Sequence, residues 1–266
     1  MENNYGGYDQ HAFIADFYDF TYNRRTDIDV TFYVDYARQA KGPILELACG
    51  TGRVLIPTAR AGCDITGLDF SSYMLAKCRE KLAKQPEDIQ KQVKLVQGDM
   101  TDFSTGEKYA LITIPFRPFQ HLMSVKEQKA CLNCVRGHLE PQGLLAFDLF
   151  HPYPGRLLPS PEAAAERQDF PEFELPDGRK VTRCSRFADF HREQQINDIE
   201  LIYYVTHPDG RKERLVDTFP MRYYFRYEIE HLLELCGFKV VNLFGGFDNS
   251  TFKNDSPEMI FVAGKK

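Results

Sequence analysis

The sequence has 266 residues, of which 43% are hydrophobic and 27% are charged, as in ordinary soluble globular proteins, and this length fits one α/β core with an insertion. The formal net charge of -5 gives no basic surface that would attract phosphate backbones or anionic lipids, which argues against a nucleic-acid or membrane partner. No stretch approaches the roughly 20 consecutive apolar residues of a membrane span, and the polar residues 1–4 do not resemble a signal peptide, so we expect a cytoplasmic protein.

Apolar and amphipathic segments alternate from residue 44 to residue 150, the pattern of a parallel sheet with helices on both faces. Helices are expected from about 53 to 60, from about 72 onward, and from 124 to 137, where Ser124-Val125-Lys126-Glu127 is a capping-box sequence. The predicted strands are 44–48, 64–68, 93–97, 111–115 and 144–150.

The alternation stops after residue 150, where the chain is rich in proline: Pro152, Pro154, Pro159 and Pro161. From about 170 to 225, long alternating segments are joined by Pro-Asp-Gly turns at 176–178 and 208–210, which predicts an antiparallel meander. A helix near 227–236 and strands at 239–244 and 259–263 then resume the first pattern. We therefore predict a core (41–151 and 226–266) and a β-rich insertion (152–225) suited to a substrate cover or a homodimer surface.

Seven cysteines, at 49, 63, 78, 131, 134, 184 and 236, do not suggest a secreted disulfide framework. Cys131 and Cys134 have the spacing of half a zinc site, but no second pair or histidine stands at a matching distance. They also lie inside a helical pattern. We expect free thiols and no metal.

Gly50 and Gly52 directly follow the first predicted strand and precede a helix, so backbone amides there can approach a ligand closely. A dinucleotide-binding fold would also place glycines here, with a third glycine where Leu55 stands. The acidic Glu46 at the strand end is likewise foreign to that pattern. The turn therefore indicates a ligand site that differs from a dinucleotide site.

Two more carboxylates end the next two strands. Asp69 follows Gly52 by 17 residues, where it can accept hydrogen bonds from both hydroxyls of a ribose, and Asp99 follows the third strand. The carboxyl ends of parallel strands meet in one crevice, so these two and Glu46 converge there. Their charge suits a cationic sulfonium cofactor with a ribose and an amine better than a pyrophosphate.

Residues 44–52 (ILELACGTG), 67–71 (GLDFS) and 97–100 (QGDM) resemble the three cofactor motifs of class I S-adenosylmethionine-dependent methyltransferases, at the family spacing. The resemblance covers residues 10–150 and 226–263. It implies an α/β, Rossmann-like, mostly parallel sheet of seven strands with a reversed final hairpin and helices on both faces, plus the antiparallel β-meander inserted after strand 5. It also implies S-adenosyl-L-methionine as cofactor and S-adenosyl-L-homocysteine as product.

The same resemblance implies which residues contact the cofactor. Ala48, Gly50 and Gly52 would hold the methionine part, Asp69 the ribose, and Asp99 with Met100 the adenine. Further contacts are expected from Tyr18, Glu46, Arg53, Phe70, Met74 and Ile114. Each carboxylate taken alone could instead be a helix N-cap or a solvated strand end.

Residues 15–22 (ADFYDFTY) resemble the N-terminal helix of small-molecule methyltransferases such as the sugar N,N-dimethyltransferases and the glycine N-methyltransferase group. In those enzymes this segment folds over the cofactor, which implies that residues 1–40 form a helical lid. Tyr18 and Tyr22 would then face the ligands. The alternative is that both tyrosines only pack with wetted hydroxyls.

The loop 115–122 (PFRPFQHL) lies where the family places residues beside the transferred methyl group, but it lacks the Asn-Pro-Pro-Tyr type signature of adenine or glutamine amide methyltransferases. His121 could take a proton from an amine or hydroxyl acceptor, or could bond a carbonyl at a helix start. Tyr18 is the second catalytic candidate. The substrate candidates are Tyr22, Arg117, Gln120, Arg222 and Tyr224, with surface ion pairing as the alternative for Arg117.

We therefore expect methyl transfer to a small-molecule N or O acceptor by in-line displacement, in which positioning and desolvation dominate. The alternative is an S-adenosylmethionine-binding regulatory or scaffold protein without turnover. Ala110 keeps this alternative open, because an acidic residue often stands at that position in the family. Neither the meander nor the 115–122 loop carries a recognisable substrate signature.

Overall fold

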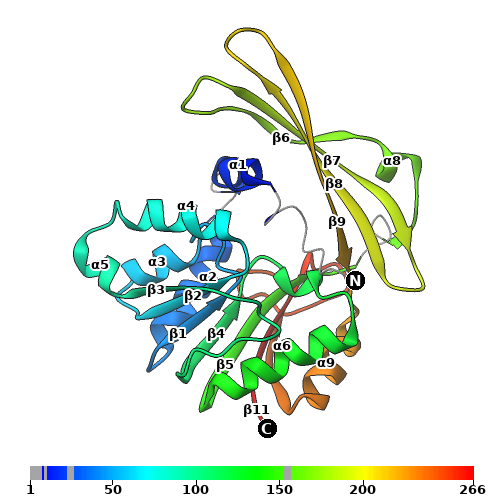
Figure 1. Ribbon diagram of the computed structural model, residues 1–266. Helices are drawn as coiled ribbons and strands as arrows, with labels where there is room; N and C mark the ends of the chain where they lie inside the picture. The colour runs from blue at the N-terminus through cyan, green and yellow to red at the C-terminus, as the bar shows by residue number, and fades with distance from the viewer. Residues whose placement is uncertain (1–7, 9–10, 23–26, 153–156) are drawn as a thin grey trace.

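The computed structural model describes residues 8, 11–22, 27–152 and 157–266, so Pro154 of the proline-rich segment and parts of the expected lid lie outside the described residues. The described chain is built around two sheets. A second, smaller sheet stands above the main one, and the helix α1 (Ala12–Tyr22) lies between them (Figure 1).

The main sheet has seven strands in the order β10-β11-β5-β4-β1-β2-β3. β11 runs antiparallel to both of its neighbours, and the remaining pairs are parallel. This arrangement confirms the predicted Rossmann-like sheet and its reversed final hairpin. The strands are β1 (Ile44–Leu47), β2 (Ile65–Asp69), β3 (Val93–Gln97), β4 (Tyr109–Ile114), β5 (Leu139–Phe150), β10 (Phe238–Phe244) and β11 (Glu258–Lys265).

Alternate residues of the central strands point to opposite faces of this sheet, and each face has its own core. Leu45 and Ile112 belong to the core under α6 (Val125–His138) and α9 (Arg226–Leu235). Ile44 and Leu111 belong to the core under three other helices. These are α2 (Ile28–Gln39), α3 (Leu55–Arg60) and α4 (Ser72–Leu82). A short helix, α5 (Glu87–Lys91), precedes β3.

β5 begins at Leu139, well before the predicted start at residue 144. Pro141 and Gly143 are residues that favour turns, but the chain there stays extended, and Leu139 pairs with Tyr109 of β4 through an irregular register. A Cβ on Gly143 would lie 2.8 Å from the carbonyl oxygen of Tyr109, so only glycine allows this close approach. The capping box of Ser124 and Glu127 is present as expected.

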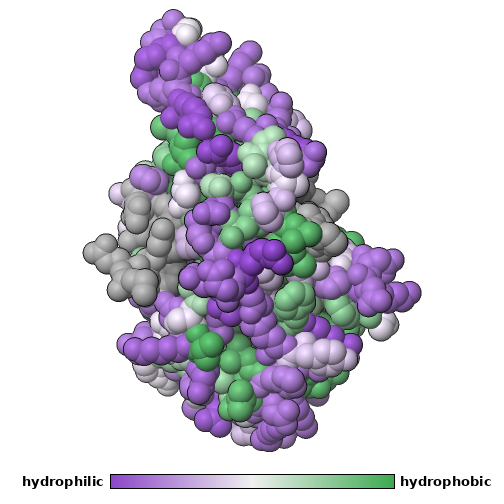
Figure 2. Space-filling view, turned by 90° about the vertical axis from the view of Figure 1, so that its right-hand side faces the viewer, coloured by the Kyte–Doolittle hydropathy of each residue, from purple (hydrophilic) through white to green (hydrophobic). Residues whose placement is uncertain are grey.

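The insertion forms a four-stranded antiparallel sheet in the order β6-β7-β8-β9, as the meander pattern predicted. Its strands are β6 (Arg167–Glu174), β7 (Lys180–His191), β8 (Ile196–Thr206) and β9 (Lys212–Arg222), with a short helix α8 (Pro161–Ala164) before them. Gly178 and Gly210 take positive φ angles in the two Pro-Asp-Gly turns. The projecting end of the sheet is mostly hydrophilic (Figure 2).

The face of the insertion sheet that looks toward the core packs on α1. Phe17 is fully buried there, with its ring 6.2 Å from that of Phe173 and 5.4 Å from that of Tyr203. All seven cysteines are free. Within the described ranges, no helix is long and apolar enough to span a membrane, and no group of three metal-ligating side chains gathers.

Candidate active site

The chain leaves β1 through a tight turn, residues 48–54, in which Ala48, Gly50 and Gly52 all have positive φ angles. A Cβ on Gly50 would meet nothing within 4 Å, so the backbone is open on that side. On Gly52 it would lie 2.7 Å from Sγ of Cys78 on α4. Gly50 therefore leaves the backbone open, and its contact with a ligand stays a prediction, whereas Gly52 allows close packing between the turn and α4.

Asp69, the last residue of β2, holds this turn in place. Its Oδ2 accepts a hydrogen bond from the Gly50 amide at 2.7 Å, and its Oδ1 accepts one from the Ser71 amide at 2.8 Å. The side chain is buried. A fixed negative charge thus lies beside the open face of Gly50, which is compatible with ribose binding; that role stays a prediction.

Glu46 is a second buried carboxyl group, in β1 just before the turn, and is only 2% exposed. The Leu55 amide donates to it, while its Oε2 has no partner among the described residues. Burial raises its pKa to about 8; Arg53 opposes the rise and Asp69 adds to it. A carboxyl group with an unused oxygen at a strand end is well suited to a cationic group such as an ammonium ion.

Asp99 lies two residues after the end of β3, where its Oδ1 accepts hydrogen bonds from the amide and the hydroxyl of Thr101, both at 2.8 Å. Met100 packs into the core next to it, and Ile114 is buried at the end of β4. Phe70, directly after Asp69, is largely exposed. The predicted motif residues therefore gather at the carboxyl ends of β1 to β4, and each individual cofactor contact stays a prediction.

Arg53 and Phe116 link the turn to the 115–122 loop. The Arg53 guanidinium makes a two-pronged ion pair with Asp29 of α2, with one N–O distance of 3.0 Å, and lies 4.8 Å from the centre of the Phe116 ring. Its charge is therefore already matched by a carboxylate of the chain.

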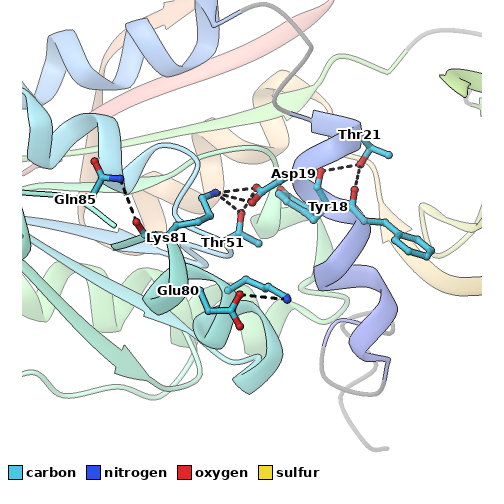
Figure 3. A network of polar contacts seen from close by, with 9 residues as sticks. Tyr18, Asp19, Thr21, Thr51, Glu80, Lys81 and Gln85 are labelled. Atoms are coloured by element: carbon cyan, nitrogen blue, oxygen red, sulfur yellow. Dashed lines mark hydrogen bonds and ion pairs between the residues drawn. The ribbon is translucent and has the colours of Figure 1, made fainter. Parts of the chain in front are cut away.

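α1 places two tyrosines above the turn, in an arrangement seen in part in Figure 3. The Tyr18 ring lies 4.6 Å from the Tyr22 ring, and the Tyr22 ring lies 4.9 Å from Phe116. Met74 of α4 packs beneath α1 against Ile14 and Ala15. Burial raises the pKa of the Tyr18 phenol, which therefore stays protonated at neutral pH.

The 115–122 loop ends in a short 3₁₀ helix, η2 (Pro118–His121). The His121 ring lies 6.2 Å from Tyr8 and 5.4 Å from Phe219 of β9. Its Nδ1 is buried and has no hydrogen-bond partner within the described residues. Burial also lowers the pKa of this imidazole to about 4. A neutral imidazole thus stands between α1 and the insertion sheet.

Four of the predicted substrate residues contact other parts of the chain, and Arg117 and Gln120 are the first two. The Arg117 side chain is 11% exposed and lies over the Phe150 ring, and its guanidinium pairs with Glu258 and lies 3.7 Å from Asp148. The ion pairing that was the alternative for Arg117 is therefore present, but in a mostly buried position. Gln120 donates to the Arg222 carbonyl at 2.7 Å and accepts from the Phe150 amide at 2.9 Å. These bonds join η2 to the ends of β5 and β9.

Arg222 and Tyr224 complete this junction. Arg222 donates to the Met123 carbonyl at 2.9 Å, and the fully buried Tyr224 donates its hydroxyl to the Leu122 carbonyl at 3.0 Å. A substrate contact stays a prediction for each of them. A small hollow of about 10 Å³, room for roughly one water molecule, nevertheless opens here, at the core end of the insertion sheet. Its lining includes Gln120, Phe150, Phe187, Asn197, Met221 and Arg222.

Polar residues on the inner face of the insertion sheet were missed by the sequence reasoning. Arg183 of β7 pairs directly with Tyr203 of β8, and Asp217 of β9 lies on the same face. Arg183 is 2% exposed, forms two 3.0 Å contacts with Asp169 and lies 4.9 Å from the Tyr22 ring. A polar residue at an inward position of an alternating strand is the signal that could have found them.

Comparisons with known proteins agree with this geometry. Residues 44–143 match the family model described as "Methyltransferase domain". The dTDP-3-amino-3,6-dideoxy-alpha-D-glucopyranose N,N-dimethyltransferase of Streptomyces fradiae is 27% identical over 88% of this chain and 86% of its own. The dTDP-3-amino-3,4,6-trideoxy-alpha-D-glucopyranose N,N-dimethyltransferase of Streptomyces venezuelae is 28% identical over 76% and 78%.

Two solved structures share the fold over nearly the whole length. The CcbJ methyltransferase from Streptomyces caelestis has a TM-score of 0.74 at 23% identity, covering 98% of both chains. CalS10, an amino pentose methyltransferase from Micromonospora echinaspora solved with S-adenosylmethionine, has a TM-score of 0.68 at 22% identity, covering 92% of this chain and 93% of its own. The likeness shows that this chain shares their overall fold.

Proposed function

We propose that this chain, which is a class I S-adenosylmethionine-dependent methyltransferase, methylates an amine nitrogen of a small molecule such as an amino sugar. S-adenosylmethionine is its cofactor, and when bound it supplies a sulfonium methyl group that a nucleophile displaces in line.

The buried acids at the strand ends fit this cofactor. In the proposed arrangement, Glu46 and the turn with Gly50 and Gly52 would bind the methionine part of the cofactor. The partnerless oxygen of Glu46 and the open backbone at Gly50 suit a cationic, polar group. Asp69 binds the ribose, and Asp99 with Met100 binds the adenine. These assignments place the methyl group toward α1 and the 115–122 loop.

The observation that carries the proposal is the state of His121. With a pKa lowered to about 4, its imidazole is neutral at physiological pH, so it can accept a hydrogen bond from an attacking amine. An alkyl hydroxyl would need a much stronger base to become a nucleophile. A neutral amine needs only to be positioned and to lose its proton after attack, so the site favours nitrogen over oxygen.

In the proposed mechanism, aromatic rings of α1 and the 115–122 loop exclude water from the reacting atoms. Tyr18, Tyr22 and Phe116 line one side in ring-to-ring contact. The Tyr18 phenol remains protonated, so it acts as a hydrogen-bond donor and not as a base. We also propose that residues 1–40 act as the lid and residues 152–225 as the acceptor cover, since α1 packs on the insertion sheet.

The test compares matched acceptors that differ at one atom. The purified chain is incubated with S-adenosylmethionine and either dTDP-3-amino-3,6-dideoxy-α-D-glucopyranose or the same sugar nucleotide with a hydroxyl at position 3. We expect S-adenosylhomocysteine release and one or two added methyl groups, found by mass spectrometry, with the amine alone. Transfer to the hydroxyl compound only would contradict the nitrogen assignment. Cofactor binding without turnover on any amine, phenol or sugar would favour the regulatory alternative.

A further inference from the structure

Three polar side chains fasten α1 to the turn after β1, as Figure 3 shows. Asp19 of α1 accepts a hydrogen bond from the Thr51 hydroxyl at 2.6 Å. Lys81 of α4 places its Nζ 2.8 and 3.0 Å from the two oxygens of Asp19 and 3.3 Å from the Thr51 hydroxyl. We call Asp19, Thr51 and Lys81 the latch.

The latch reaches into the part of the chain that faces the cofactor. Thr51 stands between Gly50 and Gly52 and is fully buried, so its position is coupled to the backbone of the turn. Asp19 and Lys81 are only 25% and 29% exposed, which protects their ion pair from most solvent screening. Tyr18 precedes Asp19, so the same contacts also fix where its ring lies above the turn.

We propose that Asp19 and Lys81 are positioning residues that couple closure of α1 to retention of the cofactor. In this proposal a ligand bound at the turn leaves by movement of α1, and that movement must break the hydrogen bonds and the ion pair of the latch. The broken latch would also leave the buried Thr51 hydroxyl without its acceptor, which adds to the barrier. The latch therefore slows cofactor release and holds Tyr18 in place during methyl transfer.

A second ion pair between the same two helices provides the matched control. Asp16 of α1 lies 2.9 Å from Lys77 of α4, but these side chains are 41% and 35% exposed. In the described residues, neither Asp16 nor Lys77 contacts the turn. Such an exposed pair contributes little and is easily screened by salt. Removing one carboxylate charge from α1 at either site changes its net charge equally.

The experiment compares Asp19→Asn with Asp16→Asn in the full chain. Each variant is loaded with radiolabelled S-adenosylmethionine, and release into excess unlabelled cofactor is followed by rapid filtration. We expect Asp19→Asn to release the label about 5–20-fold faster, and Asp16→Asn to stay within about twofold of the parent. Lys81→Met should accelerate release similarly, and the double variant Asp19→Asn/Lys81→Met should add little, because both act through one contact.

Two readouts separate positioning from general stability. The melting temperature of the cofactor-free protein should fall more for Asp19→Asn than for Asp16→Asn, because the latch is the less exposed of the two ion pairs. A purely structural role would give the same fall in melting temperature and leave release unchanged. Equal release rates for parent, Asp19→Asn and Asp16→Asn would overturn the proposal, as would equal acceleration by both variants. Release is measured without an acceptor, so a failure of amine methylation would leave this result intact.

Discussion

At the residue scale, burial controls the protonation of the Glu46 carboxyl group. Its carboxyl group lies in β1 beside Asp69 and Arg53, and burial is the largest cause of its raised pKa of about 8. In the cofactor-free protein it therefore carries a proton at neutral pH. A cation placed against its Oε2 would favour the charged form and expel that proton.

This predicts that cofactor binding releases a proton and strengthens as pH rises from about 6 to about 8. The sign follows because the free protein holds a proton that the complex does not, so lower pH favours the free form. Titration calorimetry in two buffers with different ionisation enthalpies measures the proton count. Glu46→Gln keeps the shape but cannot titrate, so binding should weaken and lose its pH dependence. An unchanged pH dependence in Glu46→Gln would rule out this role.

The same pKa bears on the stability of the free protein. The folded-state pKa of about 8 exceeds the ordinary value of 4.5, so the folded form binds a proton more tightly than the unfolded form. The stability that this bound proton gives the folded protein is fully present below the ordinary pKa of 4.5 and is lost as pH rises through about 8. At neutral pH, a cofactor that expels this proton must therefore spend part of its binding free energy on deprotonating Glu46.

At the element scale, the two glycines of the turn at 48–54 have different surroundings. Gly50 and Gly52 both have positive φ angles, but only Gly52 lies against side chains, those of Cys78 and Ile56. The motif spacing predicted both glycines as ligand contacts. It could not assign Gly52 to packing, because that depends on where α4 crosses the turn.

Alanine at these two positions should therefore have different effects. Gly52→Ala combines backbone strain with a clash at Cys78, so we expect a loss of about 2–4 kcal/mol in the free energy of unfolding. Gly50→Ala should cost only about 1–2 kcal/mol through strain, yet weaken cofactor binding by at least about tenfold, because its methyl group occupies the open face. Denaturant unfolding and calorimetry measure the two quantities. Parent-like cofactor affinity in Gly50→Ala would contradict the proposed ligand position.

The strands show what sequence pattern can and cannot predict. β1, β2 and β3 were predicted to within a residue or two, because each is a short apolar segment that ends near a carboxylate. The early start of β5 was missed because Pro141 and Gly143 favour a turn locally, while pairing with β4 keeps the chain extended. Tertiary pairing, which a local pattern does not contain, decided that boundary.

At the scale of the whole molecule, α1 joins the two sheets. Phe17 packs on the insertion sheet, while Asp19 and Met74 connect the helix to the core. Figure 1 shows α1 between the two sheets. The sequence indicated a lid, a core and an insertion. It did not indicate that Arg183 and Asp217 face α1, since this depends on the register of β7, β8 and β9. The homodimer through the insertion stays a prediction.

This arrangement encloses the reacting atoms between three separate parts of the chain. The carboxyl ends of β1 to β4 would hold the cofactor, α1 would cover it, and the insertion sheet would close the acceptor side next to His121 and Phe219. Methyl transfer by positioning and desolvation requires such enclosure, because little covalent chemistry is left to the protein.

The most direct test is a crystal structure of the chain with S-adenosylhomocysteine. We predict ribose hydroxyls on Asp69, the amino acid part at Glu46 and Gly50, and a sulfur atom that faces Tyr18, Tyr22 and His121. The account would be contradicted by a ligand bound outside the ends of β1 to β4, or by a sulfur atom directed away from α1 and the insertion sheet.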